Sequence, residues 1–292
     1  MRTVSPILKA DGPVVITGAG GQLGRELEYR LERNNVPVVA LARGHVDITD
    51  AGAVDRAIGE TRPSLVIHTA AATDVNGCEE RRRAAYRVNV LGTWNVARSA
   101  AVVGAAMVYV STNYVFDGRK LGPYFEYDDA APLNAYGATK LQGETVARQV
   151  HDRLYVVRTS WLYSRWGTNF VSRLLDVDSV DGPLRYVGDQ VANPTCAGDL
   201  ADGILELSET GAFGVHHLVN EGATSWYGWA AAVLSNLGRD DVALEEISGD
   251  EFLRSAAVPQ NTELANEMAR SVGVEMRPWT EALASHIRAV VE

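Results

Sequence analysis

The stretch Pro13-Val-Val-Ile-Thr-Gly-Ala-Gly-Gly-Gln-Leu-Gly24 decides the fold of this 292-residue chain. A short apolar run ends in a cluster of glycines, and apolar residues with helical spacing follow from Leu23 to Leu31. Gly18 permits a sharp turn, Gly21 lets a pyrophosphate approach the backbone, and Gly24 lets the helix pack on the strand. This strand, turn and helix predict a dinucleotide-binding unit, with a plain tight turn as the alternative.

Short apolar runs and helical patterns alternate along the next part of the chain. The further runs are Val36–Leu41, Ser64–His68, Ala106–Val110 and Leu154–Arg158, and the helical patterns between them are Ala51–Ile58, Glu79–Val103 and Asn134–Val150. Continuous apolar strands that alternate with helices predict a parallel sheet covered on both faces. We therefore expect an α/β fold in which residues 1–160 form a Rossmann-type, doubly wound NAD(P)-binding domain.

After Trp161 the pattern loosens into helices separated by short strands. The expected helices are Phe170–Leu175, Asp199–Leu207, Trp226–Leu237, Thr262–Arg270 and Trp279–Val291. This pattern indicates a smaller, mixed α/β C-terminal lobe at residues 161–292 that mainly binds substrate, with a segment at about 199–220 returning to the Rossmann domain. We expect a cleft where the two parts meet.

Composition and charge exclude several classes of protein. The chain is 46% hydrophobic and 22% charged, as soluble globular proteins are. No stretch reaches the roughly 18 uncharged apolar residues of a membrane span, and Met1–Gly12 lacks the apolar centre of a secretory signal. We therefore expect a cytoplasmic protein with no membrane role. A net charge of −10 argues against nucleic acid as a partner.

The two cysteines, Cys78 and Cys196, lie far apart and form neither a CxxC motif nor a Cys/His cluster. We expect both to be core thiols, with no disulfide framework and no metal site.

The end of the second expected strand, Ala42-Arg43, bears on which nicotinamide cofactor is bound. An acidic residue there would hold the ribose 2'-hydroxyl, whereas the Arg43 guanidinium can clamp a 2'-phosphate. We therefore expect NADPH, with NADH as the alternative if Arg43 is merely solvated. Asp47 and Ile48 are expected against the adenine, and the small side chains of Thr69–Thr73 where the diphosphate and ribose pass.

Tyr136 and Lys140 lie four residues apart, and hence on one face of the helix that follows the fourth strand. Hydride delivery to a ketone leaves an alkoxide that needs a proton. A tyrosine with an ordinary pKa of about 10 exchanges protons poorly at neutral pH unless a nearby cation stabilises its phenolate. Lys140 is expected to supply that charge, and the Thr112 hydroxyl, at the end of the strand, to polarise the carbonyl. The three residues predict a reductase centre.

With these residues in place, the chain resembles the dTDP-4-dehydrorhamnose reductase-like family, nucleotide-sugar ketoreductases of the extended short-chain dehydrogenase/reductase type. The resemblance runs over nearly the whole length. It is carried by nine segments in order: Gly20–Gly24, Asp47–Asp50, Val66–Ala72, Ser111–Gly118, Pro132–Glu144, Arg158–Tyr163, Asn169–Val171, Asp189–Thr195 and Thr224–Trp226.

The resemblance implies reduction of a dTDP-4-keto-6-deoxyhexose at C4 in deoxysugar biosynthesis, with Thr112, Tyr136 and Lys140 as the catalytic residues. Together with the residues singled out above, the expected cofactor contacts are Gly18, Gly21, Gln22, Leu23, Gly24, Arg43, Asp47, Ile48, Ala70, Ala71, Ala72, Val110, Tyr136 and Lys140. The implied substrate contacts are Thr112, Asn113, Trp161, Asn169, Gln190 and Thr195. Trp161 could instead be core, and the last three could instead shape loops.

Three departures from the family pattern lie on the side of the expected site that binds the sugar. Asn113 and Asn76 stand where the family usually has Asp, and Val258-Pro-Gln-Asn-Thr262 stands for Arg-Pro-x-Asn-Ser. Because a carboxylate and a guanidinium are absent, hydrogen bonding to the sugar changes, and we expect a sugar different from that of the family's reductases. Since Thr112, Tyr136 and Lys140 are intact, we expect catalysis to be retained.

Two other functions stay open from the sequence. One is a non-catalytic dinucleotide-binding regulatory subunit, against which the intact Thr112, Tyr136 and Lys140 argue. The other is a nucleotide-sugar epimerase or dehydratase; a dehydratase generally needs added carboxylates, and Asn113 follows Thr112 here. Some relatives form homodimers through a metal held by glutamates. No spacing of acidic residues such as Glu292 compels such a site, so a homodimer stays one expectation.

Overall fold

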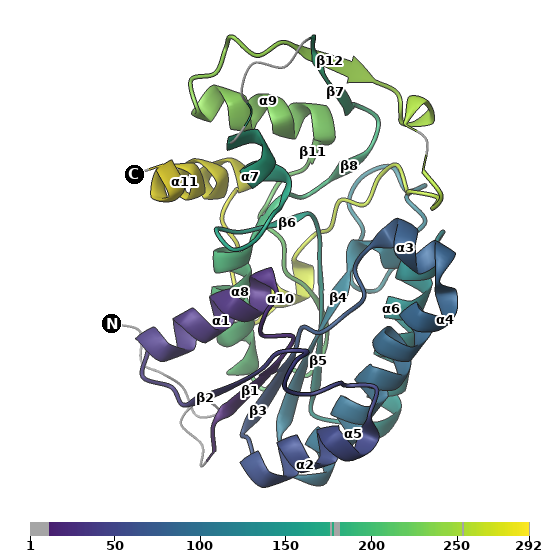
Figure 1. Cartoon of the computed structure of the whole chain (residues 1–292), viewed down its shortest axis with the longest axis vertical. Coiled ribbons are helices and arrows are strands. Elements are labelled where there is room, and N and C mark those ends of the chain that lie inside the picture. Colours follow the sequence, from purple (N-terminus) through teal and green to yellow (C-terminus); the bar gives the residue numbers. More distant parts are fainter. Residues whose placement is uncertain (1–11, 176, 178–181, 253, 292) are drawn as a thin grey trace.

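The computed structural model describes residues 12–175, 177, 182–252 and 254–291. The opening residues 1–11, in which we expect no secretory signal, and Glu292 lie outside this part of the chain. A large sheet with helices on both sides fills the lower part of Figure 1, and a smaller group of helices and short strands lies above it.

Parallel strands form a central six-stranded sheet in the order β10-β5-β4-β3-β1-β2. Their bounds are β1 Val14–Thr17, β2 Val38–Leu41, β3 Leu65–His68, β4 Ala106–Thr112, β5 Leu154–Thr159 and β10 Gly214–His217. The chain moves outward from β1 to β2 and then returns to place β3 on the other side of β1. Ligands of doubly wound sheets bind at such a reversal, beyond the carboxyl ends of the strands. The predicted α/β fold is confirmed.

Helices cover both faces of this sheet (Figure 1). Strand residues alternate between the two sides: Val14 and Ile16 face one core and Val15 the other. Both cores are closed by helices, so β1, β3 and β5 are buried along their whole length, while β2 and β10, at the two edges of the sheet, are partly exposed. The helices on the first face are α1 Gln22–Arg33, α8 Ala197–Ser208 and α10 Glu267–Ser271, and those on the second are α2 Ala51–Thr61, α5 Thr93–Val102 and α6 Ala135–Val150.

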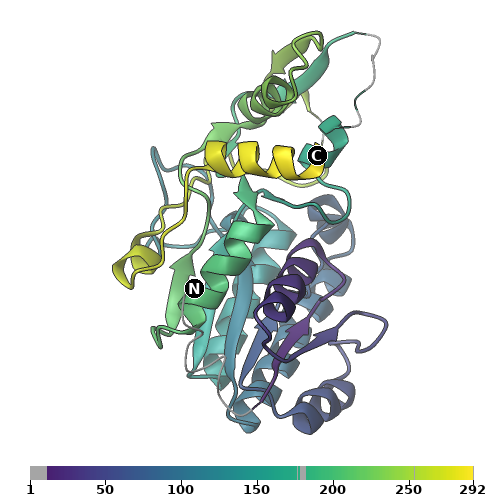
Figure 2. The same cartoon turned by 90° about the vertical axis from the view of Figure 1, so that its left-hand side faces the viewer.

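The smaller part has its own apolar cluster, built around Tyr163, Trp229 and Leu283. The helices of this smaller part are α7 Phe170–Leu175, α9 Trp226–Asn236 and α11 Trp279–Val291. Figure 2 shows α11 lying across the junction between the sheet and this smaller part. Its strands pair as β7 Leu184–Val187 with β12 Leu244–Ile247, β6 Leu162–Tyr163 with β9 Thr195–Cys196, and β8 Val191–Ala192 with β11 Thr224–Ser225.

Within the segment at about 199–220, α8 shares the core of α1 and β10 pairs with β5 at the edge of the central sheet. The division of the chain at residues 160 and 161, and the assignment of the second part to substrate, stay our predictions.

Two of the expected helices are wrong in extent. The single helix expected over Glu79–Val103 is interrupted: Arg81 leaves the helical conformation, and Arg87–Gly92 is π-helical. The surrounding pieces are α3 Val75–Glu80, α4 Arg82–Tyr86 and α5. The wide turn brings the buried Asn89 to the backbone of Ala72, so a tertiary contact accompanies the irregularity, and such π-turns are frequent at functional sites.

The helix expected over Thr262–Arg270 begins only at Glu267. The preceding residues are extended, because the Thr262 amide donates to the Val191 carbonyl and the Glu263 carbonyl accepts from Tyr124. Pairing with two distant segments has replaced local helix formation there.

Candidate active site

A cleft of about 1080 Å³ lies beyond the carboxyl ends of β1, β3 and β4, at the reversal of the strand order. Its walls come from the glycine turn, the ends of the strands, the first turns of α6, and the segment from Thr159 to Leu162. Every cofactor contact expected from the sequence lines this cleft, as do Thr112, Asn113 and Trp161. Their roles toward ligands stay predictions.

The glycine turn has the shape that a diphosphate requires. Gly18 has a φ of 77°, and a Cβ there would lie 2.5 Å from the amide nitrogen of Ala70. A Cβ at Gly24 would lie 2.5 Å from the carbonyl oxygen of Gly18. Since Gly21 precedes α1 without a side-chain cap, the first amides of the helix are left to face a ligand.

The cleft is locally positive although the chain as a whole is acidic. Among the described residues that line it, the charged ones are the cations Arg25, Arg43, Arg87 and Lys140 and a single carboxylate, Asp47. Hydrogen bonds from Thr49 lower the pKa of Asp47, and the charges of Arg43 and Arg87 act in the same direction. This excess of cations suits an anionic ligand.

Thr112 ends β4, while Tyr136 and Lys140 lie one turn apart at the start of α6. The first turn of α6 packs closely on the segment after β4, since a Cβ at Gly137 would overlap the carbonyl oxygen of Tyr114. Asn134 caps the helix by accepting a hydrogen bond from the Gly137 amide at 2.9 Å. The local packing therefore needs glycine directly after Tyr136.

Lys140 is buried, and its Nζ donates to the carbonyl oxygen of Val110 at 2.7 Å. The same ammonium lies 4.1 Å from the centroid of the Tyr109 ring. Burial lowers the pKa of Lys140 to about 7, against the opposing charge of Glu144. A lysine poised near neutrality can both hold and release a proton.

Burial raises the pKa of Tyr136 to about 12, and a side-chain hydrogen bond with Thr112 acts in the opposite direction. Without a ligand the phenol is therefore neutral at neutral pH and carries the proton that a reduction would consume. The stabilisation of its phenolate by Lys140 stays a prediction.

Trp161 packs against the apolar cluster of the smaller part, and its contact with a substrate stays a prediction. Its ring stacks on Trp226 with centroids 3.8 Å apart, and it also lines the cleft. Its φ of 40° lies in the left-handed region, which non-glycine residues enter at an energetic cost.

Asn169, Gln190 and Thr195 are buried and do not belong to the cleft lining found in the described residues. Asn169 donates to the Ser164 carbonyl at 2.7 Å and accepts from the Ser172 amide at 3.1 Å. The fully buried Thr195 hydroxyl donates to the Asn193 carbonyl at 3.3 Å. For Asn169 and Thr195 these contacts favour the alternative that they shape loops, whereas the buried Oε1 of Gln190 has no hydrogen-bond partner. A direct substrate contact stays a prediction for all three.

Sequence reasoning missed two residues that build the site. The Asn89 side chain accepts from the Ala72 amide at 2.8 Å and donates to Thr139 at 3.0 Å, which fixes the end of β3 against α6. Arg87 lines the cleft beside Asp47. In the sequence, Asn89 is one polar residue within an expected helix, and Arg87 follows a run of arginines at 81–83. Neither pattern indicates which residue it would contact.

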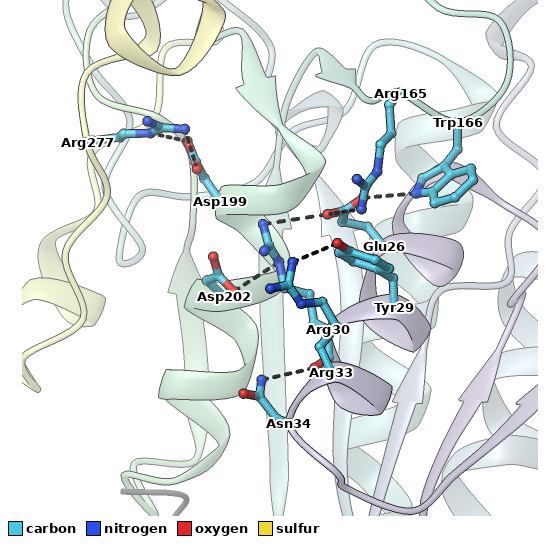
Figure 3. A network of polar contacts seen from close by, with 10 residues as sticks. All are labelled: Glu26, Tyr29, Arg30, Arg33, Asn34, Arg165, Trp166, Asp199, Asp202 and Arg277. Carbon is cyan, nitrogen blue, oxygen red and sulfur yellow. Dashed lines mark hydrogen bonds and ion pairs between the residues drawn. The ribbon is translucent and has the colours of Figure 1, made fainter. Parts of the chain in front are cut away.

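A polar network attaches the smaller part of the molecule to α1, beside the glycine turn of the cleft (Figure 3). Glu26 on α1 accepts from the Trp166 indole at 2.9 Å and pairs with Arg165 at 3.3 Å. Ser164 donates to Gln22 at 3.1 Å. Since Trp166 and Gln22 both line the cleft, these contacts fix one of its walls.

Known proteins are similar to this chain in both sequence and fold. The family described as the RmlD substrate binding domain matches residues 12–291. The chain belongs to this family. It is 38% identical to dTDP-4-dehydrorhamnose reductase of Mycobacterium tuberculosis over 94% of this chain and 92% of that protein. It is 36% identical to dTDP-4-keto-6-deoxy-D-glucose reductase of Streptomyces niveus over 92% and 94%.

A solved structure has the same architecture. The crystal structure of dTDP-4-dehydrorhamnose reductase from Bacillus anthracis in complex with NADP superposes with a TM-score of 0.92 at 35% identity, covering 95% of this chain and 99% of that one. The expected family resemblance is thereby confirmed.

Within residues 12–291, leaving out the positions not described, no group of three or more His, Cys, Asp or Glu side chains is placed to hold a metal ion. None of the helices that the structure describes combines the length and apolar character needed to cross a bilayer.

The lowered pKa of Lys140 predicts a pH dependence of stability. In the folded protein this pKa is about 7, below its ordinary value of 10.5, so the unfolded chain binds the proton more tightly between these values. Folding stability due to Lys140 therefore rises with pH through this window. We expect Lys140→Met to be most stabilising, relative to wild type, at pH 7 and below, and less so near pH 10.

Urea unfolding of both proteins across this pH range measures the difference, and the titration of shared groups cancels in it. A difference in the free energy of unfolding that stays constant with pH would contradict the buried, shifted lysine.

Proposed function

We propose that the protein is an oxidoreductase of the CH–OH class that reduces the C4 ketone of a dTDP-linked 4-keto-6-deoxyhexose in deoxysugar biosynthesis, with NADPH preferred over NADH. The observation that carries this proposal is that Thr112, Tyr136 and Lys140 line one cleft with the glycine turn. The reductases from Mycobacterium tuberculosis and Bacillus anthracis support the substrate class, and the NADP of the latter supports the cofactor.

The residues present fit a dinucleotide. The glycine turn and the uncapped start of α1 would hold the diphosphate, and Arg43 and Arg87 supply positive charge near Asp47. When bound, the reduced nicotinamide supplies the hydride that the ketone accepts.

The chain's own side chains then bind and protonate the carbonyl oxygen of the substrate. The Thr112 hydroxyl donates a hydrogen bond to it, and Tyr136, neutral at physiological pH, gives its proton to the oxygen as negative charge develops. The carbon gains a hydride and the oxygen gains a proton, so the ketone becomes a secondary alcohol. The pKa of Lys140 is about 7, so its ammonium form is available at neutral pH. Its positive charge stabilises the Tyr136 phenolate until a proton returns from solvent.

The chain departs from its family at residues expected near the sugar, so the identity of the sugar is the part of this proposal that these departures affect. Asn113 lines the cleft, and Asn76 accepts a hydrogen bond from the Ala256 amide at 3.2 Å, so both departures meet the C-terminal segment. The Streptomyces niveus relative, which carries the name of a different 4-keto sugar, supports such a change. A homodimer and a cytoplasmic location stay predictions from the sequence.

Tyr136→Phe removes the proton donor while keeping the ring, so we expect kcat to fall about a hundredfold or more with substrate binding retained. The measurement is NADPH oxidation with a dTDP-4-keto-6-deoxyhexose. Tyr155→Phe is the control, because Tyr155 lies outside the cleft lining and its hydroxyl donates to the Ser208 carbonyl in the buried core of the sheet. Near-normal turnover by Tyr136→Phe would exclude Tyr136 as the donor.

Arg43→Ala removes a guanidinium expected to face the 2'-phosphate, so kcat/KM should fall about tenfold with NADPH and little with NADH. Arg56→Ala, on the exposed face of α2 and outside the cleft lining, should change neither. An equal loss with both cofactors would show that Arg43 does not read the phosphate.

A further inference from the structure

Asn113 links the catalytic Thr112 to the C-terminal segment. The Thr112 hydroxyl donates to the Asn113 Oδ1 at 3.1 Å, and the Asn113 Nδ2 donates to the Thr262 Oγ1 at 2.7 Å. All three side chains are between 1% and 4% exposed, so water does not compete for these bonds. Thr262 lies 149 residues from Asn113 along the chain and belongs to the segment that departs from the family pattern.

Thr262 is a fixed anchor for this path. Its amide donates to the Val191 carbonyl at 2.8 Å, and its hydroxyl reaches the same oxygen at 3.5 Å. The neighbouring Asn261 side chain donates to the carbonyls of Lys120 and Gly122, each at 2.8 Å. The hydroxyl of Thr262 is therefore held in place by backbone on both sides.

An amide between two hydroxyls can satisfy them in two ways. In the structure the Thr112 hydroxyl donates its proton to the Asn113 Oδ1, so this proton is not available to a ketone oxygen. If the amide turns over, its NH2 donates to Thr112 while its oxygen accepts from Thr262, and the proton of Thr112 is then free for a ketone oxygen. Both arrangements leave no buried polar group unpaired, because each hydroxyl can donate or accept. A carboxylate at position 113 would only accept.

We propose that Thr262 is a positioning residue for the reduction, whose hydroxyl acts through Asn113 to set the direction in which the Thr112 hydroxyl donates. The proposal rests on the proposed function, since it assigns Thr112 to the substrate carbonyl. Thr262 itself does not line the cleft in the described part of the chain, so its effect reaches the reaction only through the amide.

Thr262→Val keeps the shape of the side chain and removes its hydroxyl, so we expect kcat to fall about tenfold while the KM for NADPH stays unchanged. Thr262→Ser restores the hydroxyl and should recover most of the rate. Ser208→Ala removes another buried hydroxyl, one that donates to the Leu205 carbonyl outside the cleft, and should leave kcat unchanged.

A double-mutant cycle separates this role from general destabilisation. Because Thr262 acts through Asn113, Thr262→Val should cost little further kcat in an Asn113→Ala background. Additive losses, an unchanged kcat in Thr262→Val, or no recovery in Thr262→Ser would overturn the proposal.

The hydrogen-bond path is also measurable without turnover, from hydrogen exchange of the Asn113 side-chain NH2 by 15N NMR. The signal should be protected in wild type and Thr262→Ser and exchange faster in Thr262→Val; equal exchange in all three contradicts the path. Protected signals in a wild-type protein that reduces no keto sugar would contradict the proposed function and the positioning role of Thr262 together. If the wild type turns over normally and Thr262→Val leaves kcat unchanged, only the positioning role of Thr262 is contradicted.

Discussion

The site depends on the parallel direction of the central strands. Because β1, β3, β4 and β5 all run the same way, their carboxyl ends meet at one edge, and each end brings a different component of the site. The glycine turn follows β1, the small residues from Ala70 follow β3, and Thr112 ends β4. The close approach of Gly18 to Ala70 shows how little space separates the first two, and a side chain larger than hydrogen at Gly18 would push the edge apart.

The same edge concentrates groups that are costly to the fold. Burial disfavours the charged form of Lys140, and Trp161 adopts a backbone conformation that costs energy outside glycine. Such features persist only where surrounding structure fixes them. Here the contact of α6 with the segment after β4, and the link from Glu26 to Trp166, hold the two walls of the cleft in place.

Local patterns in the sequence predicted the central sheet and most of the residues that line the cleft. The glycine spacing, the apolar runs and the Tyr136–Lys140 spacing each follow from short-range geometry, and each is found in the structure where it was expected. The π-helical turn at Arg87–Gly92 and the extended backbone after Thr262 were not predictable, because partners distant in sequence impose them. For the same reason, the pairing of Asn113 with Thr262 had no local signal, although both residues stood out as departures from the family.

Reduction of a sugar ketone by this protein is tested most directly by isotope transfer, followed by NMR, from NADPH carrying deuterium at both positions of nicotinamide C4 to a panel of dTDP-4-keto and dTDP-3-keto hexoses. We expect stoichiometric NADPH oxidation and deuterium on C4 of the sugar alcohol formed from a dTDP-4-keto-6-deoxyhexose. An isomerised or dehydrated sugar without net NADPH oxidation, deuterium at another carbon, or no transfer to any sugar of the panel would contradict it.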